Sequence, residues 1–288
     1  PRRGRRGPAG ERPRASRRAR GRPSPSAPVP KRHAAAIRQG SEGFRAPPVE
    51  DVNIGFELPR LRFRAIPNPD LDSETSQGYE LGLRYFSAGN SLSLTWFDTR
   101  FEDLIESRAR IGIDPASGFL EFQSRNIDQA RIRGVDLRFE QGLEALNDAL
   151  DGWVFSLAAM WSRGDNESNG QPLNTISPPQ AVTRLSWESA NSAFSATFST
   201  IFTARQDRVD STDGERFETP SSIVLDLTTL WQFHPSVSLS AGIFNLTDQT
   251  YWRWQDVGRL DPTDPMIPLL AMPGRSVRIS LSFATGSL

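Results

Sequence analysis

The sequence predicts an all-β fold, an antiparallel transmembrane β-barrel built from about ten or eleven strands. Three observations predict it. Short runs of alternating apolar and polar residues recur between residues 41 and 283, the connections between them are alternately short and long, and no apolar stretch is long enough for a transmembrane helix. Because lipid offers the backbone no hydrogen-bond partners, a chain of this kind can enter a membrane only as a barrel.

The composition of the 288-residue chain agrees with a sheet that has two different faces. Hydrophobic residues make up 37%, which is low for a protein with a soluble core and ordinary for a barrel with one polar face. The chain has no cysteine, which excludes disulfides and thiolate chemistry. Its two histidines leave little scope for metal or acid–base sites.

Residues 1–42 differ from the rest of the chain. Residues 1–40 hold 13 of the 34 basic residues and one of the 34 acidic residues, a charge of +12, so residues 41–288 carry −12. This Arg/Pro-rich segment has almost no large apolar residue, and we predict that it is disordered. It could serve as a nucleic-acid tail. We favour a mis-framed translation of GC-rich DNA, because the composition changes abruptly at Gly43–Phe44, and we expect no nucleic-acid partner.

The first clear strands form a predicted hairpin. Every second residue is apolar in Tyr79–Tyr85, and the alternation resumes in Leu92–Thr99 after the turn Ala88–Asn90. Two runs of period two around a tight Gly-Asn turn predict a β-hairpin. Glu80 and Arg84 occupy the other face of the first strand and are predicted to point into a polar lumen.

The same alternation predicts the remaining strands. They are Ile132–Phe139, Trp153–Trp161, Ala181–Trp187, Phe194–Phe202, Ile223–Trp231, Val237–Ile243 and Val277–Phe283. Tryptophans near the strand ends are expected to form the aromatic girdles of a membrane barrel. These are Trp96, Trp153, Trp161, Trp187 and Trp231.

Three connections are long and polar: residues 164–179, 205–220 and 247–273. Structureless loops of this length are uncommon in compact soluble domains but typical of the extracellular rim of a barrel. A soluble antiparallel sandwich also alternates and is the alternative fold. The loop asymmetry favours the barrel, which would place the chain in the outer membrane of a Gram-negative bacterium, surrounded by lipid.

Four motifs occur in order along residues 43–283. They are Gly43-Phe44-Arg45-Ala46-Pro47, the segment Pro67–Ser76 that leads into Gly78–Gly82, the segment Asn245–Tyr251, and Met272–Arg275 before the last strand. Together they resemble the TonB-dependent outer-membrane receptors. The resemblance implies a barrel of roughly 22 strands, of which residues 43–283 would form the C-terminal part, followed by a tail at 284–288. The plug domain and TonB box of the family would be missing, so we expect this chain, a fragment, to be inactive alone.

The first two motifs resemble the haem/haemoglobin branch of that family most closely. The resemblance implies ligand-binding roles for Phe44, Arg45, Ala46, Pro47, Asn68, Pro69, Asp70 and Leu71. It implies haem or a ferric chelate as a transported ligand rather than a cofactor, a haem protein or siderophore as the source, and the TonB system as partner of full-length relatives. The branch has a haem-ligating histidine between the two motifs, and residues 48–67 here contain none. Tyr251, Met266 and Met272 have side chains able to ligate haem iron, but we favour interfacial packing as the role of each.

A siderophore receptor and a passive porin-like barrel are the alternatives to a receptor for haem. Enzymes are not favoured, because the sequence has no Gly-x-Ser-x-Gly, no HExxH and no phosphate-binding glycine loop. The carboxylates between Asp207 and Glu215 could bind calcium, but we interpret them as a solvated loop and expect no metal site.

Overall fold

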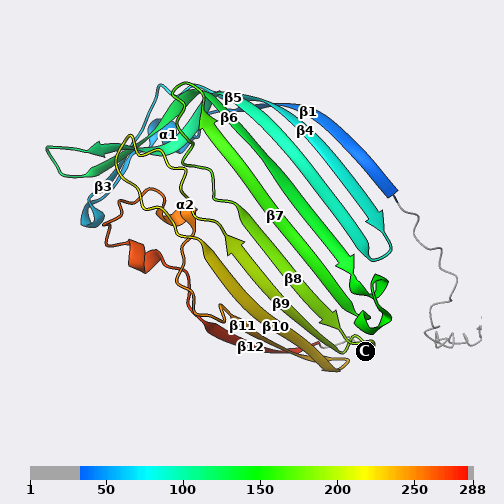
Figure 1. Cartoon of the computed structure of the whole chain (residues 1–288). Coiled ribbons are helices and arrows are strands. Elements are labelled where there is room, and N and C mark those ends of the chain that lie inside the picture. The colour runs from blue at the N-terminus through cyan, green and yellow to red at the C-terminus, as the bar shows by residue number, and fades with distance from the viewer. Residues whose placement is uncertain (1–32, 285–288) are drawn as a thin grey trace, which may run out of the picture.

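The computed structural model describes residues 33–284, which form a curved antiparallel sheet with loops folded against its concave side (Figure 1). Ten strands follow one another across it: β1 (His33–Arg45), β4 (Glu74–Ser87), β5 (Asn90–Ile113), β6 (Leu120–Gly142), β7 (Trp153–Asn166), β8 (Gln180–Glu188), β9 (Phe194–Thr203), β10 (Ser222–His234), β11 (Val237–Phe244) and β12 (Ser276–Phe283). Each pairs with the next, and β1 and β12 are not paired with each other in the described residues. The predicted all-β antiparallel architecture is therefore confirmed. Within residues 33–284 the sheet is open and does not close into a barrel.

Short and long connections lie at opposite ends of this sheet. The strands join through short links at one end, such as residues 88–89 and 235–236. At the other end the first long connection carries α1 (Val49–Asn53), β2 (Phe56–Leu58), the 3-10 turn η1 (Pro59–Leu61) and β3 (Phe63–Ile66), and the last carries α2 (Trp254–Val257) and η4 (Ile267–Leu270). The link before β7 holds two 3-10 turns, η2 (Leu143–Ala145) and η3 (Asp148–Leu150). Within residues 33–284, no helix has the length and apolar character needed to cross a bilayer.

Strand β1 corrects the prediction for the N-terminal segment. It pairs with β4 along its whole length, from His33 opposite Phe86 to Arg45 opposite Glu74. Disorder was therefore wrongly predicted for residues 33–42. Pairing with a neighbouring strand depends on main-chain hydrogen bonds and needs no large side chains. The small residues of this segment therefore form a strand without the apolar alternation that predicted the other strands. Residues 1–32 lie outside the described part of the chain, as do residues 285–288 of the tail.

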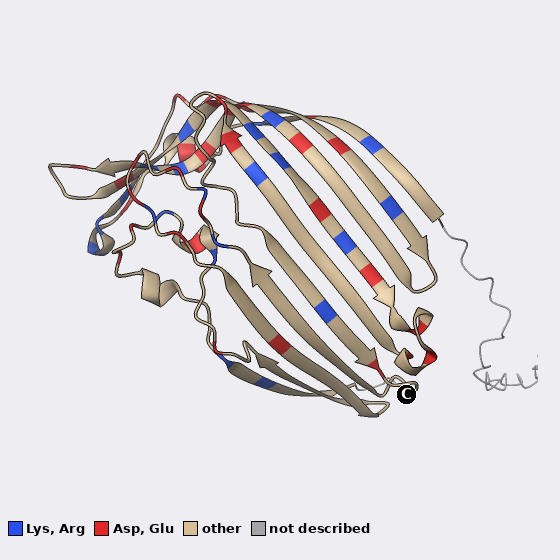
Figure 2. Ribbon diagram, viewed as in Figure 1, with Lys and Arg blue, Asp and Glu red and all other residues tan. Residues whose placement is uncertain are grey.

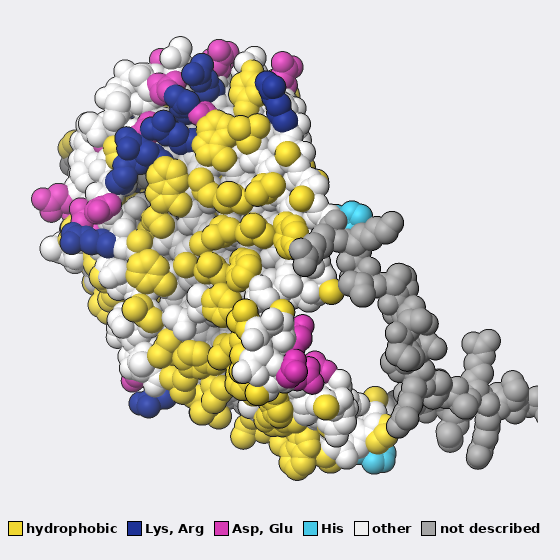
Figure 3. Space-filling view, turned by 45° about the vertical axis from the view of Figure 1, so that its right-hand side comes forward, with side chains coloured by type: hydrophobic (Ala, Val, Ile, Leu, Met, Phe, Trp, Pro, Cys, Tyr) yellow, Lys and Arg dark blue, Asp and Glu magenta, His cyan; other side chains and the backbone are white. Residues whose placement is uncertain are grey.

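The register places one set of alternating residues on the convex face. Leu83 lies opposite Leu94, and Leu94 lies opposite Leu137, so these side chains share a face. On the same face, at the far edge of the sheet, Ile279 of β12 is 70% exposed. Figure 3 shows the resulting apolar band across several strands. A continuous exposed apolar surface across several strands is typical of a face that contacts lipid.

The predicted tryptophans lie at two levels of this band. Trp153 and Trp187 have ring centroids 6.3 Å apart near the short turns, and Trp231 lies near the same end of β10. Trp96 and Trp161 both lie opposite Val135, farther along the strands. Trp153 and Trp161 are separated by about 26 Å along the strand, or about 20 Å along the barrel axis at a tilt near 40°. This spacing matches two interfacial girdles.

The concave face carries Glu80 and Arg84, as predicted, among both polar and apolar residues. Their register partners are Phe97 and Ser93, which lie on the face opposite to the apolar band. Farther along the same face Arg138 and Asp136 form an ion pair at 3.3 Å. Figure 2 shows that charged residues are most frequent where the long connections emerge. The charged side chains and the long connections therefore place the candidate binding site at that end of the sheet.

Candidate functional site

Three adjoining cavities lie where the extensions of β5 and β6 meet the connections that follow β7, β9 and β11. Glu106 and Asn174 line both the first and the second cavity. Thr175, Trp254 and Gln255 line both the second and the third. The shared walls make these cavities one composite site whose lining changes from polar to cationic to aromatic.

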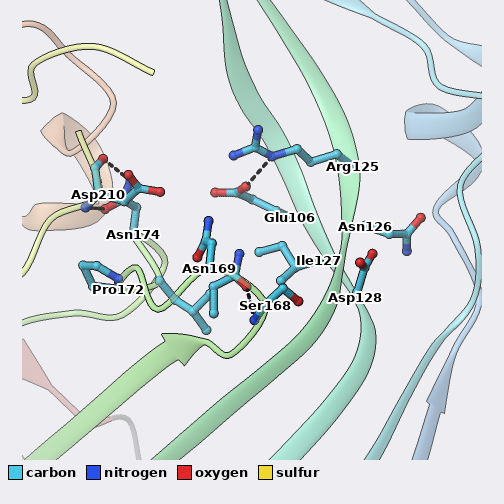
Figure 4. Close-up of a pocket in the computed structure, with 12 residues that line it drawn as sticks. Glu106, Arg125, Asn126, Ile127, Asp128, Ser168, Asn169, Pro172, Asn174 and Asp210 are labelled. Carbon is cyan, nitrogen blue, oxygen red and sulfur yellow. Dashed lines mark hydrogen bonds and ion pairs between the residues drawn. The ribbon is translucent and has the colours of Figure 1, made fainter. Parts of the chain in front are cut away.

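The first cavity, of about 240 Å³, is a polar junction between loops. Figure 4 shows Glu106 and Arg125 beside the segments that carry Asn174 and Asp210. Arg125 Nε donates to Glu106 at 3.0 Å and its Nη2 donates to Asp213 at 3.2 Å. Burial disfavours the charge on Arg125, but the two carboxylates outweigh it and raise the pKa of the guanidinium. These bonds hold the connection after β9 against β6.

The same junction joins two loops to each other. Asn174 Nδ2 donates to the Asp210 carbonyl at 2.9 Å, and the Asp210 amide donates to Asn174 Oδ1 at 2.8 Å. The reciprocal pair fixes the connection after β7 beside the connection after β9. The hydrogen-bonding groups of this cavity are thus largely used in holding the loops.

The second cavity, of about 180 Å³, is lined by four arginines: Arg108, Arg110, Arg216 and Arg259. Glu106 is the single carboxylate of its lining, and it is already bonded to Arg125. Arg216 is 8% exposed, and burial lowers the pKa of its guanidinium. Desolvation, followed by the nearby Arg108 charge, lowers the pKa of Arg259. Since arginine stays protonated in proteins, the cavity is strongly cationic at neutral pH.

Arg110 is the least satisfied of these residues. Its Nε and Nη1 atoms are buried without a hydrogen-bond partner in the described residues. Buried polar donors are normally paired, and leaving them unpaired costs about 1–3 kcal/mol each. Arg216 is better placed, since its Nε donates to the Asp210 carbonyl at 2.9 Å. An anion that entered the cavity would supply the acceptors that Arg110 lacks.

The third cavity is the largest, about 780 Å³, and has an aromatic and sulfur-containing lining. Trp254 is 3% exposed, and its indole Nε1 donates to the Asn174 carbonyl at 2.8 Å. Trp252 Nε1 donates to the Ile267 carbonyl at 2.8 Å. Each indole ring is thereby fixed in orientation. The other lining residues include Phe97, Ile132, Met160, Val224, Tyr251 and Met272.

Tyr251 supplies the phenol of this aromatic cavity. Burial, together with the nearby Asp226 carboxylate, raises the pKa of Tyr251. Its carbonyl accepts a bond from the Met272 amide at 2.9 Å, which places these two candidate iron ligands on adjacent segments. Tyr251 and Met272 therefore lie at the site, as the sequence allowed, whereas Met266 does not line the cavity.

The last long connection is held at both ends by the third and fourth motifs. Asn245 is 3% exposed and has a positive φ of 53°. Its Nδ2 donates to the Gln249 carbonyl at 2.9 Å and to the Pro273 carbonyl at 3.2 Å. Asp248 Oδ1 accepts the Arg275 amide at 2.6 Å, and a Cβ on Gly274 would lie 2.6 Å from that oxygen. The motifs thus position the loop that carries Tyr251, Trp252 and Trp254.

The eight residues proposed from the first two motifs lie outside the lining of these three cavities. Phe44 is 72% exposed, and Arg45 pairs with Glu74 at 3.3 Å. Ala46 and Pro47 lead from β1 into α1. Leu71 is 8% exposed, and Pro69 and Asp70 form the turn beside it. Their role in ligand binding stays a prediction.

Asn68 connects the second motif to the cationic cavity. Its Nδ2 donates to the Ser124 carbonyl at 2.9 Å, and Ser124 Oγ accepts the Arg108 amide at 3.0 Å. Glu74, at the end of the same connection, accepts the Ile105 amide at 3.0 Å. The motif therefore contacts the strand segment that carries Arg108 and Arg110.

Sequence reasoning missed the arginines of the cationic cavity and the tryptophans of the aromatic one. The Arg108-Ala109-Arg110 and Trp252-Arg253-Trp254 repeats were the available signals, but their separation of about 140 residues concealed that they meet. The acidic loop residues are engaged elsewhere, as Asp213 is with Arg125. Among residues 33–284 no group of three histidine or carboxylate side chains is arranged to hold a metal ion.

A meander with an apolar outer band, aromatic girdles and long loops folded over a polar interior defines a class, the ligand-binding membrane β-barrels. Residues 39–246 match the family described as TonB dependent receptor-like, beta-barrel. The chain belongs to this family, whose members are transport receptors of the Gram-negative outer membrane.

Two similar proteins come from Haemophilus influenzae. One, named probable hemoglobin and hemoglobin-haptoglobin-binding protein 4, is 23% identical over 270 residues, covering 83% of this chain and 27% of the relative. Hemoglobin-binding protein A is 25% identical over 274 residues, covering 84% and 27%. The chain thus spans little more than a quarter of the length of these relatives.

Solved structures agree on the fold. The copper transporter OprC superposes with a TM-score of 0.69 at 18% identity, covering 87% of this chain and 37% of that one. A mutant of the ferric enterobactin receptor of Pseudomonas aeruginosa gives a TM-score of 0.63 at 19% identity, covering 87% and 38%. At such identities the likeness concerns the fold alone.

Proposed function

We propose that this chain is part of the barrel of an outer-membrane receptor that takes up an iron-bearing ligand, with haem, free or delivered by haemoglobin, as that ligand. The observation that carries the proposal is the contact between an aromatic cavity of about 780 Å³ and an arginine cavity with unpaired donors. A ligand for this composite site must be flat and apolar at one end and anionic at the other.

Haem has this chemistry. Its macrocycle is flat and apolar and suits a cavity lined by Trp252 and Trp254, and its carboxylates suit Arg110 and Arg216. The volume of the aromatic cavity lies in the range of about 300–1,000 Å³ that is typical of small-molecule sites. Tyr251, Met160 and Met272 supply the oxygen and sulfur ligands that haem iron accepts in other proteins.

The relatives support the same ligand class. The two Haemophilus proteins are named for binding haemoglobin, and the third and fourth motifs shape the loop that carries Tyr251. Within the proposal, the outer membrane is the location and the TonB system drives release of the ligand. The first two motifs act on the ligand by holding the segment of Arg108 and Arg110.

Titration of the purified chain with hemin tests the proposal. We expect a saturable shift of the Soret band, with Tyr251→Phe changing the spectrum of the bound haem. Arg110→Met should weaken binding by at least about tenfold, since one charge-assisted contact is worth about 1.5–3 kcal/mol. Tyr79→Phe, on the convex face, is the matched control and should leave the haem spectrum and the affinity for hemin unchanged. Binding that is unaffected by both site variants would refute the assignment.

A ferric siderophore is the second candidate, because the arginine cavity would accept any anionic chelate. Competition separates the two ligands. If ferric enterobactin displaces bound hemin and binds more tightly than hemin, the siderophore is the better assignment. If it leaves the Soret spectrum unchanged, haem is.

A further inference from the structure

Asn174 is hydrogen-bonded to two other long connections at the place where the three cavities adjoin. Its side chain exchanges two hydrogen bonds with the main chain of Asp210, at 2.9 and 2.8 Å. Its own carbonyl accepts the Trp254 indole at 2.8 Å. Figure 4 shows Asn174 beside the segment of Asp210. One residue thus joins the connection after β7 both to the connection after β9 and to the last long connection.

The carbonyl of Asp210 extends this arrangement to the arginine cavity. It accepts Arg216 Nε at 2.9 Å as well as Asn174 Nδ2 at 2.9 Å. The Asp210 carboxylate is engaged separately, since its Oδ1 accepts the Thr212 amide at 2.9 Å. Four hydrogen bonds therefore run without a break from Arg216 to Trp254. They fix a buried guanidinium of the arginine cavity and a buried indole of the aromatic cavity.

The chemistry of asparagine suits this position. Its short amide carries both donors and an acceptor, so it can pair with a main-chain carbonyl and amide at once, whereas an ionised carboxylate has no donor. Gln206 provides a contrast within the same loops. Its Nε2 donates to the Ile176 carbonyl at 2.8 Å and also joins the connections after β7 and β9, without a bond to Arg216 or Trp254. The particular contribution of Asn174 is therefore the relative placement of the arginine and the aromatic groups.

We propose that Asn174 is the positioning residue that sets the distance between the arginine half and the aromatic half of the composite site. It makes the site specific for ligands whose anionic group lies at one fixed distance from a flat apolar face. A ligand that occupies only one half is bound independently of Asn174. The inference rests on the proposed function in one respect, the use of a porphyrin as the ligand that spans both halves.

Hemin and hemin dimethyl ester, whose carboxylates are masked, form the test pair. We expect the unmodified chain to bind hemin at least about tenfold more tightly than the ester, because the ester forfeits a charge-assisted contact. Asn174→Ala should reduce this ratio to about twofold or less, by weakening hemin and leaving the ester unchanged, since the carbonyl that holds Trp254 remains. Asn174→Gln keeps the donor and the acceptor and should recover part of the ratio. Gln206→Ala, the matched control, removes a bond between the same two connections and should keep the full ratio.

Two results of these titrations would overturn the positioning role. One is an unchanged ratio in folded Asn174→Ala, and the other is an equal fall of the ratio in Gln206→Ala, which would show that any loosening of the loops has the same effect. If the unmodified chain binds neither porphyrin, or binds both equally, the proposed function fails instead, and a measurement without a ligand decides the inference.

That measurement is the nuclear magnetic resonance signal of the Trp254 indole N–H, identified by its loss in Trp254→Phe. Arg216→Met should move the signal in the otherwise unmodified chain and leave it in place in the Asn174→Ala background. A signal that moves equally in both backgrounds, or in neither, overturns the inference. If Asn174→Ala lacks β-structure by circular dichroism, the Arg216→Met chain alone decides, because an indole signal that it does not move contradicts the path through Asn174.

Discussion

The strands of the sheet and the loop network at its end are stabilised in opposite ways. In the strands, stability comes from main-chain ladders and from many similar apolar side chains, such as Leu83, Leu94 and Leu137 in one row. In the loops it comes from single polar residues with several bonds each, such as Asn245. The residues that stabilise the strands are thus many and similar, whereas those that stabilise the loops are few and make several hydrogen bonds each.

This difference explains where function resides. The strands are built from interchangeable residues, which tolerate substitution on each face and contact lipid through the apolar band. The loops place unlike groups at fixed positions, so that Arg110 of β5 and Trp254 of the last long connection line one cavity. Recognition of a particular ligand needs the second kind of construction.

The largest effect should come from a charge in the apolar band. Leu92→Arg places a cation on the convex face about midway between the rows that hold Trp153 and Trp161, and in a bilayer we expect about 2–4 kcal/mol of destabilisation. Denaturant unfolding of the chain in phosphatidylcholine vesicles measures it. The nearby Thr95→Arg points to the opposite face beside Asp136 and should cost less than about 1 kcal/mol. Equal costs for the two variants would contradict the assignment of the faces.

A slightly smaller effect is expected in the loops. Asn245→Ala removes three hydrogen bonds and puts alanine at a φ of 53°, so we expect about 2–3 kcal/mol of destabilisation, concentrated in residues 245–275. Faster protease cleavage within that loop measures the local part. Asn191→Ala, in an exposed short turn of the wall, is the control and should change little. Unchanged cleavage with Asn245→Ala would show that the loop is held by other contacts.

The same contrast decides what could be read from the sequence. Alternation along Tyr79–Tyr85 and Trp153–Trp161 predicted strands, because burial on one face leaves a period of two in any such strand. β1 escaped prediction, since the alanines of residues 34–36 carry no such period. Tyr251 and Met272 line the aromatic cavity, but the sequence alone favoured interfacial packing for both and gave no sign of a cavity beside them.

The arginine cavity could not be predicted in this way. Arg108 and Arg110 lie on a strand extension, Arg216 follows β9, and Arg259 follows α2. Their convergence depends on bonds such as that between Asn174 and Asp210, which obey no sequence period. Asn68 of the second motif contacts the strand segment behind the arginines. A ligand-binding role for the first two motifs stays a prediction.

A smaller effect should follow from loosening that contact. Asn68→Ala removes the bond to the Ser124 carbonyl, and we expect about 1 kcal/mol of destabilisation because the site is partly buried. Hemin affinity should fall by several-fold, since the backbone of Arg108 is held through Ser124. Asn53→Ala, an exposed residue of the same connection, should change neither quantity. A stability loss with full hemin affinity would separate the motif from ligand binding.

The smallest effect concerns the ionisation of Tyr251. Burial raises its pKa in the folded chain, so as pH rises above the ordinary tyrosine value of about 10 the unfolded chain loses the phenol proton first. The stability contributed by the neutral phenol is therefore present below pH 10 and is lost as pH rises through the folded pKa. A difference titration of phenolate absorbance between the chain and Tyr251→Phe should show a midpoint above 10. Bound hemin should lower that midpoint if the phenolate ligates iron, because the metal charge favours the deprotonated form. A midpoint that hemin does not move would assign Tyr251 to the lining of the aromatic cavity and leave Met160 or Met272 to hold the iron.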